Sequence, residues 1–115
     1  VVLPWRRDPH GDHRATWHLF RAAVTDGPAP HFFEYPIWVW DLGDPADHPG
    51  PEVRGYRLDV STVLARKRTA IRQHLSQLTD LIDDDPTGFR LQPKNLAHFD
   101  HPWELYYEEA PIAAP

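Results

Sequence analysis

The chain has 115 residues, of which 41% are hydrophobic, 12% aromatic and 25% charged, with a formal net charge of −5 at pH 7. This composition is typical of one globular domain rather than of a disordered segment, and the acidic balance with scattered basic residues argues against nucleic acid as a partner. No apolar run approaches the roughly 20 residues that a membrane-spanning helix needs, so we expect no membrane span and a cytoplasmic protein.

The first predicted elements are a strand and a helix with a polar turn between them. Val1-Val2-Leu3 is typical of the end of a buried strand. From His13 onward apolar residues recur at helical spacing, which predicts a helix over about residues 13–24. We expect Trp17 and Phe20 on that helix to pack in the core. In open α/β sheets, ligands bind at such strand-to-helix turns.

The turn contains a cluster of imidazoles and carboxylates, Asp8-Pro9-His10-Gly11-Asp12-His13. With Asp12 as the helix N-cap, His10 and His13 would face one small volume. Such a cluster can supply a metal ligand, a proton donor and a carboxylate that fixes one imidazole tautomer. Since the chain has no Cys, imidazoles and carboxylates are its only strong metal ligands. The same residues are also typical of a capped, solvated helix start, so spacing alone leaves both interpretations open.

Two strands separated by a loop are predicted in the middle of the chain. Residues 32–40 are dense in aromatic and β-branched side chains, which predicts a strand covered on both faces, with Pro36 at an edge or a bulge. These aromatic rings either pack in the core or line a sugar site. Residues 41–52 are rich in Pro and Gly and predict a surface loop. Residues 54–60 alternate apolar and polar, which predicts a half-buried strand that pairs antiparallel with the preceding one.

The longest predicted helix covers about residues 62–82, with Ser61 as its N-cap. Lys67 and His74 interrupt its apolar face, and a polar group on a buried face needs a partner. Each of the two is therefore either anchored by a structural contact or aimed at a cleft. The remaining chain is predicted to wrap back over the core and to end in a short strand near residues 104–108.

Four stretches match a set of family motifs in order: Asp8-Pro9-His10-Gly11-Asp12-His13-Arg14-Ala15, residues 34–40, Lys67-x-x-Ala70-x-x-x-His74-x-Ser76-Gln77, and Phe99-x-x-Pro102-Trp103-Glu104. They resemble the D-x-H-P-D-H-x-A segment, an aromatic strand, the K-x-x-A-x-x-x-H-x-S-Q helix and the F-x-x-P-W-E ending of the PIG-L/LmbE family of zinc-dependent N-acetylglucosaminyl deacetylases. Gly11 stands where the family usually has Pro, which loosens that turn.

The resemblance implies an α/β fold, namely the C-terminal half of a Rossmann-like, three-layer domain with two main helices and about three to four strands. No segment matches the family's other signature, A-H-P-D-D-E, which supplies a His and an Asp as zinc ligands and a second Asp as general base. We therefore expect residues 1–115 to be the C-terminal part of a single deacetylase domain whose N-terminal part, with that motif, is missing.

The function implied by the resemblance is zinc-dependent hydrolysis of an N-acetyl group on an N-acetylglucosamine-type or related small molecule. His13 would be a zinc ligand, His10 the general acid that stabilises the oxyanion and protonates the leaving amine, and Asp12 the carboxylate that orients His10. Three further residues would lie near the substrate or serve the structure: Asp8, Lys67 and His74. Because one imidazole does not hold zinc, we expect this polypeptide alone to be inactive.

Two other functions stay open. A non-catalytic member of the family would use the same scaffold as a carbohydrate- or ligand-binding module with a decayed site, and the loss of A-H-P-D-D-E from the whole protein would favour it. Alternatively, His10-x-x-His13 is a divalent-metal site on an unrelated domain, which leaves the later helix and tail matches unexplained.

Overall fold

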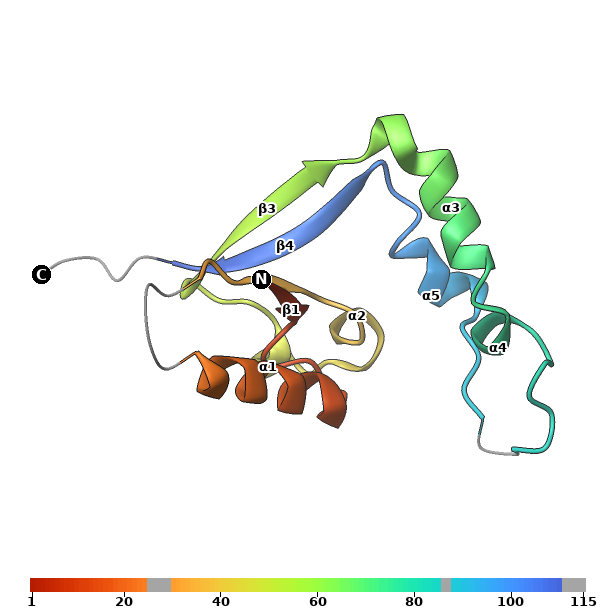
Figure 1. Ribbon diagram of the computed structural model, residues 1–115, viewed down its shortest axis with the longest axis horizontal. Helices are drawn as coiled ribbons and strands as arrows, with labels where there is room; N and C mark the ends of the chain where they lie inside the picture. The colour runs from red at the N-terminus through yellow and green to blue at the C-terminus, as the bar shows by residue number, and fades with distance from the viewer. Residues whose placement is uncertain (25–29, 86–87, 111–115) are drawn as a thin grey trace, which may run out of the picture. The chain divides into compact units, whose positions relative to one another are not determined.

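The structure, a computed structural model, describes residues 1–24, 30–85 and 88–110 and shows a mixed α/β fold with one four-stranded sheet (Figure 1). The strands are β1 (Val2–Pro4), β2 (Phe33–Tyr35), β3 (Val53–Asp59) and β4 (Trp103–Glu109). The helices are α1 (Gly11–Ala23), α2 (Val39–Leu42), α3 (Leu64–Arg72), α4 (Leu75–Leu78) and α5 (Pro93–Ala97), with 3-10 turns at Pro45–Asp47 and Ser61–Val63. No helix in these ranges is long and apolar enough to cross a membrane.

The chain divides into two compact units. Unit 1 comprises Val1–Leu58 and Leu105–Pro115, and unit 2 comprises Asp59–Glu104.

The sheet has the strand order β1-β2-β4-β3. β1 and β2 pair in parallel, with Leu3 opposite Glu34, and β2 and β4 pair antiparallel, with Glu34 opposite Tyr107. The prediction that the strand near residues 54–60 pairs with the preceding strand is therefore wrong, because β4 lies between β2 and β3.

Three predicted strands are confirmed close to their expected bounds. β1 (Val2–Pro4) corresponds to the strand end expected at Val1-Val2-Leu3. β3 (Val53–Asp59) corresponds to the strand expected over residues 54–60, and β4 (Trp103–Glu109) to the one expected near residues 104–108. The alternating pattern of β3 does not produce a buried face, since none of its residues is buried.

Unit 1 has a small core formed by Trp5, Val39 and Tyr107. The rings of Trp5 and Tyr107 meet edge to face with centroids 5.1 Å apart, a geometry that aromatic pairs favour. Trp5 Nε1 also donates to the carbonyl oxygen of Asp47 at 2.6 Å, so the indole is satisfied where it is buried. The core thus fixes the chain directly after β1, where the turn to α1 begins.

Helix α1 lies against β1 and confirms the helix predicted over about residues 13–24, although it begins two residues earlier. None of its residues is buried, and Phe20 is 50% exposed. The prediction that Trp17 and Phe20 pack in the core is therefore wrong. Trp17 is half-buried and lies against Arg6, whose guanidinium carbon is 5.0 Å from the ring centroid.

The single strand predicted over residues 32–40 is instead two elements, β2 and α2. The backbone N–H groups of Ile37 and Trp38, between these elements, donate to the carboxylate of Asp8 at 3.2 and 3.0 Å. They therefore cannot continue a sheet ladder. Pro36 does not mark an edge strand or a bulge, because β2 is a central strand that ends just before it.

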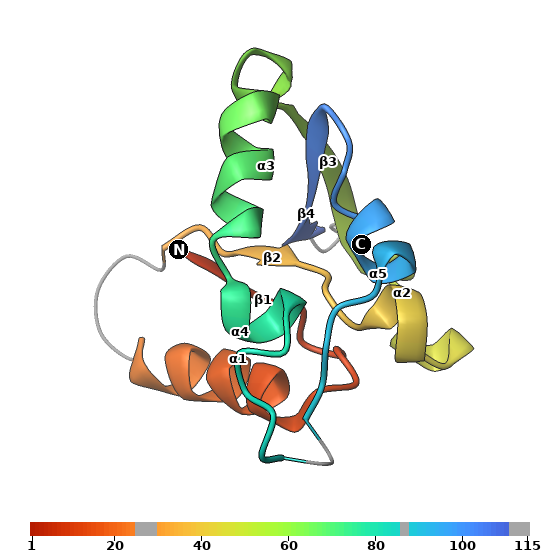
Figure 2. The same ribbon diagram turned by 90° about the vertical axis from the view of Figure 1, so that its right-hand side faces the viewer.

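The helix predicted over residues 62–82 of unit 2 is broken into a 3-10 turn, α3 and α4 (Figure 2). Val63, and not Ser61, is the N-cap of α3. The chain leaves the helix near Gln73, whose carbonyl accepts from the backbone N–H of Leu75 at 2.9 Å. No residue of α3 or α4 is buried, so the packing energy that usually holds a long helix together is small here.

A buried carboxylate and two imidazoles form the candidate functional site

Asp8 lies at the centre of the turn between β1 and α1, and its side chain is 0% exposed. Its Oδ1 accepts from the backbone N–H of His10 and contacts His13 Nδ1, each at 3.0 Å. Its Oδ2 accepts from the backbone N–H groups of Ile37 and Trp38. Four donors therefore offset the cost of burying this carboxylate, and they fix the turn against the segment that follows β2.

His13, in the first turn of α1, is oriented by Asp8. An ionised carboxylate only accepts hydrogen bonds, so the contact assigns the ring proton to His13 Nδ1 and leaves the lone pair of the neutral ring on Nε2. A carboxylate placed in this way fixes the tautomer and prepares the other nitrogen as a metal ligand or a base. The side chain is 21% exposed, so solutes can reach it.

His10 is the N-cap of α1, and its Nδ1 accepts from the backbone N–H of Asp12 at 3.2 Å. In the neutral ring the proton therefore lies on Nε2. The centroids of the His10 and His13 rings are 4.8 Å apart, with a 35° angle between the ring planes. The two imidazoles thus face one small volume, as their spacing predicts.

Asp12 does not have the place expected for it. It is not the N-cap of α1, and it contacts His10 through its backbone N–H rather than through its carboxylate. The orienting carboxylate is Asp8, and it orients His13 rather than His10. The sequence offered a signal for this arrangement, because Asp8 and His13 flank a predicted helix start at a distance that a tight turn can close.

Lys67 and His74 both belong to unit 2. Lys67 Nζ lies 3.4 Å from Glu104 Oε1, and the Lys67 side chain is only 16% exposed. The ion pair joins the stretch from Lys67 to Gln77 to the stretch from Phe99 to Glu104. Lys67 therefore has the partner that a structural role requires. His74 does not lie on a buried face, since it is exposed and stands as the N-cap of α4 without a capping side-chain bond.

The described residues contain no group of three His, Asp or Glu side chains that could hold a metal ion. The turn fits one imidazole ligand, His13 Nε2, because both oxygens of Asp8 are occupied by N–H donors. A protein site for zinc usually has at least three protein ligands. The donor set is therefore compatible with zinc only if further ligands come from outside residues 1–24, 30–85 and 88–110.

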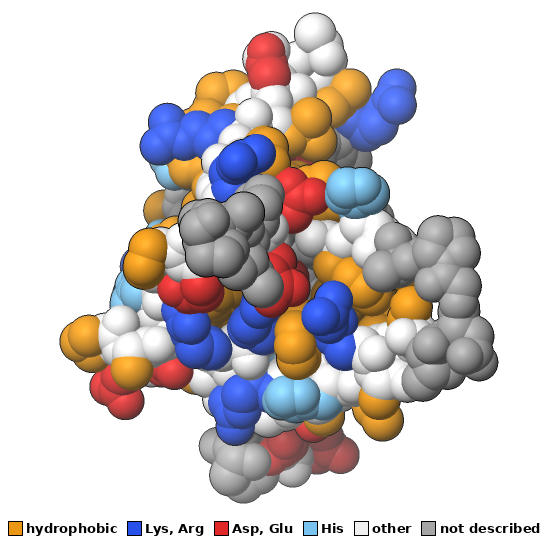
Figure 3. Space-filling model, turned by 90° about the vertical axis from the view of Figure 1, so that its left-hand side faces the viewer, with side chains coloured by type: hydrophobic (Ala, Val, Ile, Leu, Met, Phe, Trp, Pro, Cys, Tyr) orange, Lys and Arg blue, Asp and Glu red, His pale blue; other side chains and the backbone are white. Residues whose placement is uncertain are grey.

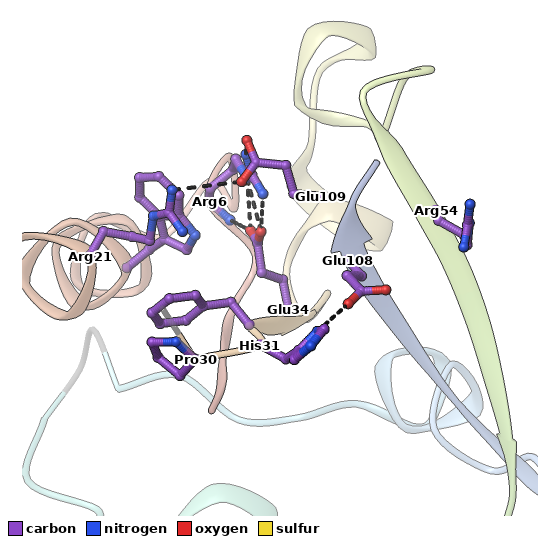
Figure 4. Close-up of a pocket in the computed structure, with 10 residues that line it drawn as sticks. Arg6, Arg21, Pro30, His31, Glu34, Arg54, Glu108 and Glu109 are labelled. Carbon is purple, nitrogen blue, oxygen red and sulfur yellow. Dashed lines mark hydrogen bonds and ion pairs between the residues drawn. The ribbon is translucent and has the colours of Figure 1, made fainter. Parts of the chain in front are cut away.

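A cavity of about 430 Å³ is lined by another set of unit 1 residues, which includes the ion pair of Arg6 and Glu34 (Figure 4). The Glu34 carboxylate is buried. It accepts hydrogen bonds from three nitrogens of Arg6, namely the backbone N, Nε and NH2. Burial acts to lower the pKa of the Arg6 guanidinium, but the hydrogen bonds and charge of Glu34 raise it above its usual value. The sequence did not reveal this pair, because 28 residues separate its members.

Comparison of the chain with protein-family models, with curated proteins and with solved structures gives no significant match. The geometry around Asp8 and the motif resemblance are therefore the observations that bear on function.

Proposed function

We propose that this chain supplies one zinc ligand and a proton donor to a zinc-dependent hydrolase of the PIG-L/LmbE type. Its substrate would be an N-acetylated small molecule such as an N-acetylglucosamine derivative. The observation that supports this proposal most strongly is the contact between buried Asp8 and His13, with the His10 ring beside it. The four motifs that resemble the family in order add to it.

His13 would hold the metal through Nε2, with Asp8 on Nδ1 fixing its orientation. When bound, zinc supplies an activated water and polarises the carbonyl of the amide. The other protein ligands would come from the N-terminal half that the proposal requires, which carries the A-H-P-D-D-E motif in the family.

His10 would act as the general acid. Hydrolysis breaks the C–N bond of the amide, and the leaving amine must take up a proton as that bond breaks. A neutral imidazole is too weak an acid for this step, so His10 would donate its Nε2 proton as an imidazolium. Nδ1, which accepts from the Asp12 N–H in the neutral ring, would then carry a proton as well. The His10 side chain is exposed, so an amide can approach it.

The scaffold we propose is a Rossmann-like, three-layer α/β domain. Strand β1, helix α1 and strand β2 follow one another in the chain, and the two strands are parallel neighbours. This is the βαβ connection from which such domains are built. Asp8, His10 and His13 follow the carboxyl end of β1, which is where open α/β sheets bind ligands.

A second candidate function is a non-catalytic ligand-binding module on the same scaffold, with a decayed site. The cavity favours it, since most residues that line the cavity are charged or aromatic and they include neither His10 nor His13.

The test is zinc content and deacetylase activity towards N-acetylglucosamine, measured on the protein that joins this chain to its proposed N-terminal half. We expect His13→Ala to lose zinc and activity, and His10→Ala to keep zinc but lose activity by about 10²–10⁴-fold, the range for general acid catalysis. His18→Ala, which removes an exposed imidazole from the same helix, should change neither. Retained zinc and activity in His13→Ala would reject the hydrolase, and a wild type without zinc would favour the binding module.

A further inference from the structure

The cavity of unit 1 is a site separate from the Asp8–His13 turn. Its volume of about 430 Å³ is within the range of roughly 300–1,000 Å³ that small-molecule pockets have. Its lining comes from Arg6 in the segment between β1 and α1, from α1, from the segment before β2, and from the strands β2, β3 and β4. Acidic and basic side chains lie next to one another on the face shown in Figure 3, so the ligand class must be inferred from individual contacts.

Arg6 is held in place by Glu34 and by two indole rings, and its guanidinium carbon lies 5.7 Å from the centroid of the Trp5 ring. Its Nε and one terminal nitrogen bind the buried Glu34, and its guanidinium carbon lies 5.0 Å from the centroid of the Trp17 ring. Its other terminal nitrogen, NH1, is not used by Glu34 and lies 3.6 Å from Glu109 Oε1. Arg6 therefore presents one fixed, charged donor that a ligand can bind.

Arg21 is positioned by aromatic rings rather than by hydrogen bonds. Its guanidinium carbon lies 5.5 Å from the Trp17 ring centroid and 5.0 Å from that of Phe32. Cation–π contacts hold the planar group without using its N–H donors. Among the residues that the structure describes, its ion pair is to Glu109 Oε2, which at 3.6 Å exceeds hydrogen-bond length. Within that part of the chain, most of the donors of Arg21 therefore stay available.

Glu109, the last residue of β4, contacts both arginines with different oxygens (Figure 4). Both distances are 3.6 Å, whereas tight guanidinium–carboxylate bonds are about 2.7–2.9 Å. The Glu109 side chain is 55% exposed, so it can turn into solvent at little cost. The chain thus places a loosely held carboxylate of its own between two fixed guanidinium groups.

We propose that Arg6 and Arg21 bind an oxyanion group, carboxylate or phosphate, of a small molecule in this cavity, and that Glu109 takes the place of that group when the ligand is absent. Once Glu109 turns away, Glu34 still neutralises Arg6, while Arg21 becomes an unpaired cation that attracts an anion. The third carboxylate at the cavity, Glu108, is occupied by Tyr56 and His31 at 2.6 and 2.9 Å. The inference does not depend on the proposed hydrolase.

The test is titration of the chain with inorganic phosphate and with acetate at constant ionic strength, followed by calorimetry and by the NMR signals of the arginine Nε–H groups. We expect saturable binding that shifts the Arg21 signal. Arg21→Gln should weaken binding by about tenfold or more, because charge-assisted hydrogen bonds are lost. Glu109→Gln should tighten binding several-fold, because the internal competitor loses its charge. Arg66→Gln, a charge-matched change on an exposed arginine of α3, should leave binding unchanged.

Tighter binding of phosphate than of acetate would identify a phosphorylated ligand, and the reverse order a carboxylic acid. The proposal is overturned if the wild type binds neither anion, if Arg21→Gln binds as well as the wild type, or if Glu109→Gln binds more weakly. Should Arg21→Gln fail to fold, Arg21→Lys keeps the charge but lacks the planar fork, and it should still bind more weakly than the wild type.

Discussion

The two units of this chain reach their structures in different ways. Unit 1 buries apolar and charged side chains together: Leu3, Trp5, Asp8, Glu34, Val39 and Tyr107 are all buried. In the described part of unit 2, residues 59–85 and 88–104, Asn95 is the buried residue. Unit 2 is instead connected by ion pairs between exposed or half-buried groups, such as Arg68 with Asp100.

The difference shows where this chain can hold side chains in fixed positions. A binding or catalytic group needs neighbours whose own positions are locked by packing and hydrogen bonds. In unit 1 the two buried carboxylates, Asp8 and Glu34, meet that condition and orient His13 and Arg6. Exposed ion pairs are worth about 0–1 kcal/mol, so they do not fix geometry in the same way. Both proposed sites accordingly lie in unit 1.

The change that would most sharply test the comparison is Asp8→Ala. It leaves four part-buried donors without their buried acceptor, and we expect a loss of about 3 kcal/mol or more in the free energy of unfolding. The measurement is urea denaturation followed by tryptophan fluorescence. Asp12→Ala is the matched control, because this carboxylate is exposed, and it should cost less than about 1 kcal/mol. Equal losses in the two variants would show that Asp8 does not organise unit 1.

Alkaline pH gives a second test, through Tyr107 in the core of unit 1. Burial raises the pKa of the Tyr107 hydroxyl to about 12, from about 10 in an unfolded chain. The folded state therefore holds this proton more tightly, so the stability it contributes is complete below about pH 10 and is lost as the pH rises towards 12. Spectrophotometric titration at alkaline pH should show one of the four tyrosines ionising late. Tyr107→Phe should remove that late phase, and ionisation of all tyrosines near pH 10 would contradict the burial of the ring.

The smallest effect is expected in unit 2, from Lys67→Ala. Its partner Glu104 is about one-third exposed, so we expect a loss of no more than about 1 kcal/mol, and less at high salt. Lys67→Met keeps most of the apolar stem and separates the loss of packing from the loss of charge. Thermal unfolding at low and high salt would measure both. A loss as large as that of Asp8→Ala would remove the contrast between the units.

The sequence was informative where the determining signals are local. Helix α1 and strand β3 lie close to their predicted places because helical spacing and apolar–polar alternation are properties of short windows. The meeting of His10 and His13 follows in the same way from a three-residue spacing across a helix start. These features needed no knowledge of distant residues.

The errors arose where a distant residue decides the local structure. Asp8 takes the backbone N–H groups of Ile37 and Trp38, 29 and 30 residues away, and thereby ends a strand that the aromatic residues alone favour. In unit 2, apolar spacing across residues 62–82 predicts one long helix. No residue of α3 or α4 is buried. Tertiary packing therefore does not supply the burial of an apolar face on which a long helix depends.

The position of His10 ties the start of α1 to one ring nitrogen. The nitrogen that receives the Asp12 N–H must keep its lone pair, so a single hydrogen bond sets both the cap of the helix and the place of the ring proton. A side chain without an acceptor at this position would leave the Asp12 N–H unsatisfied at the start of the turn from which His13 projects.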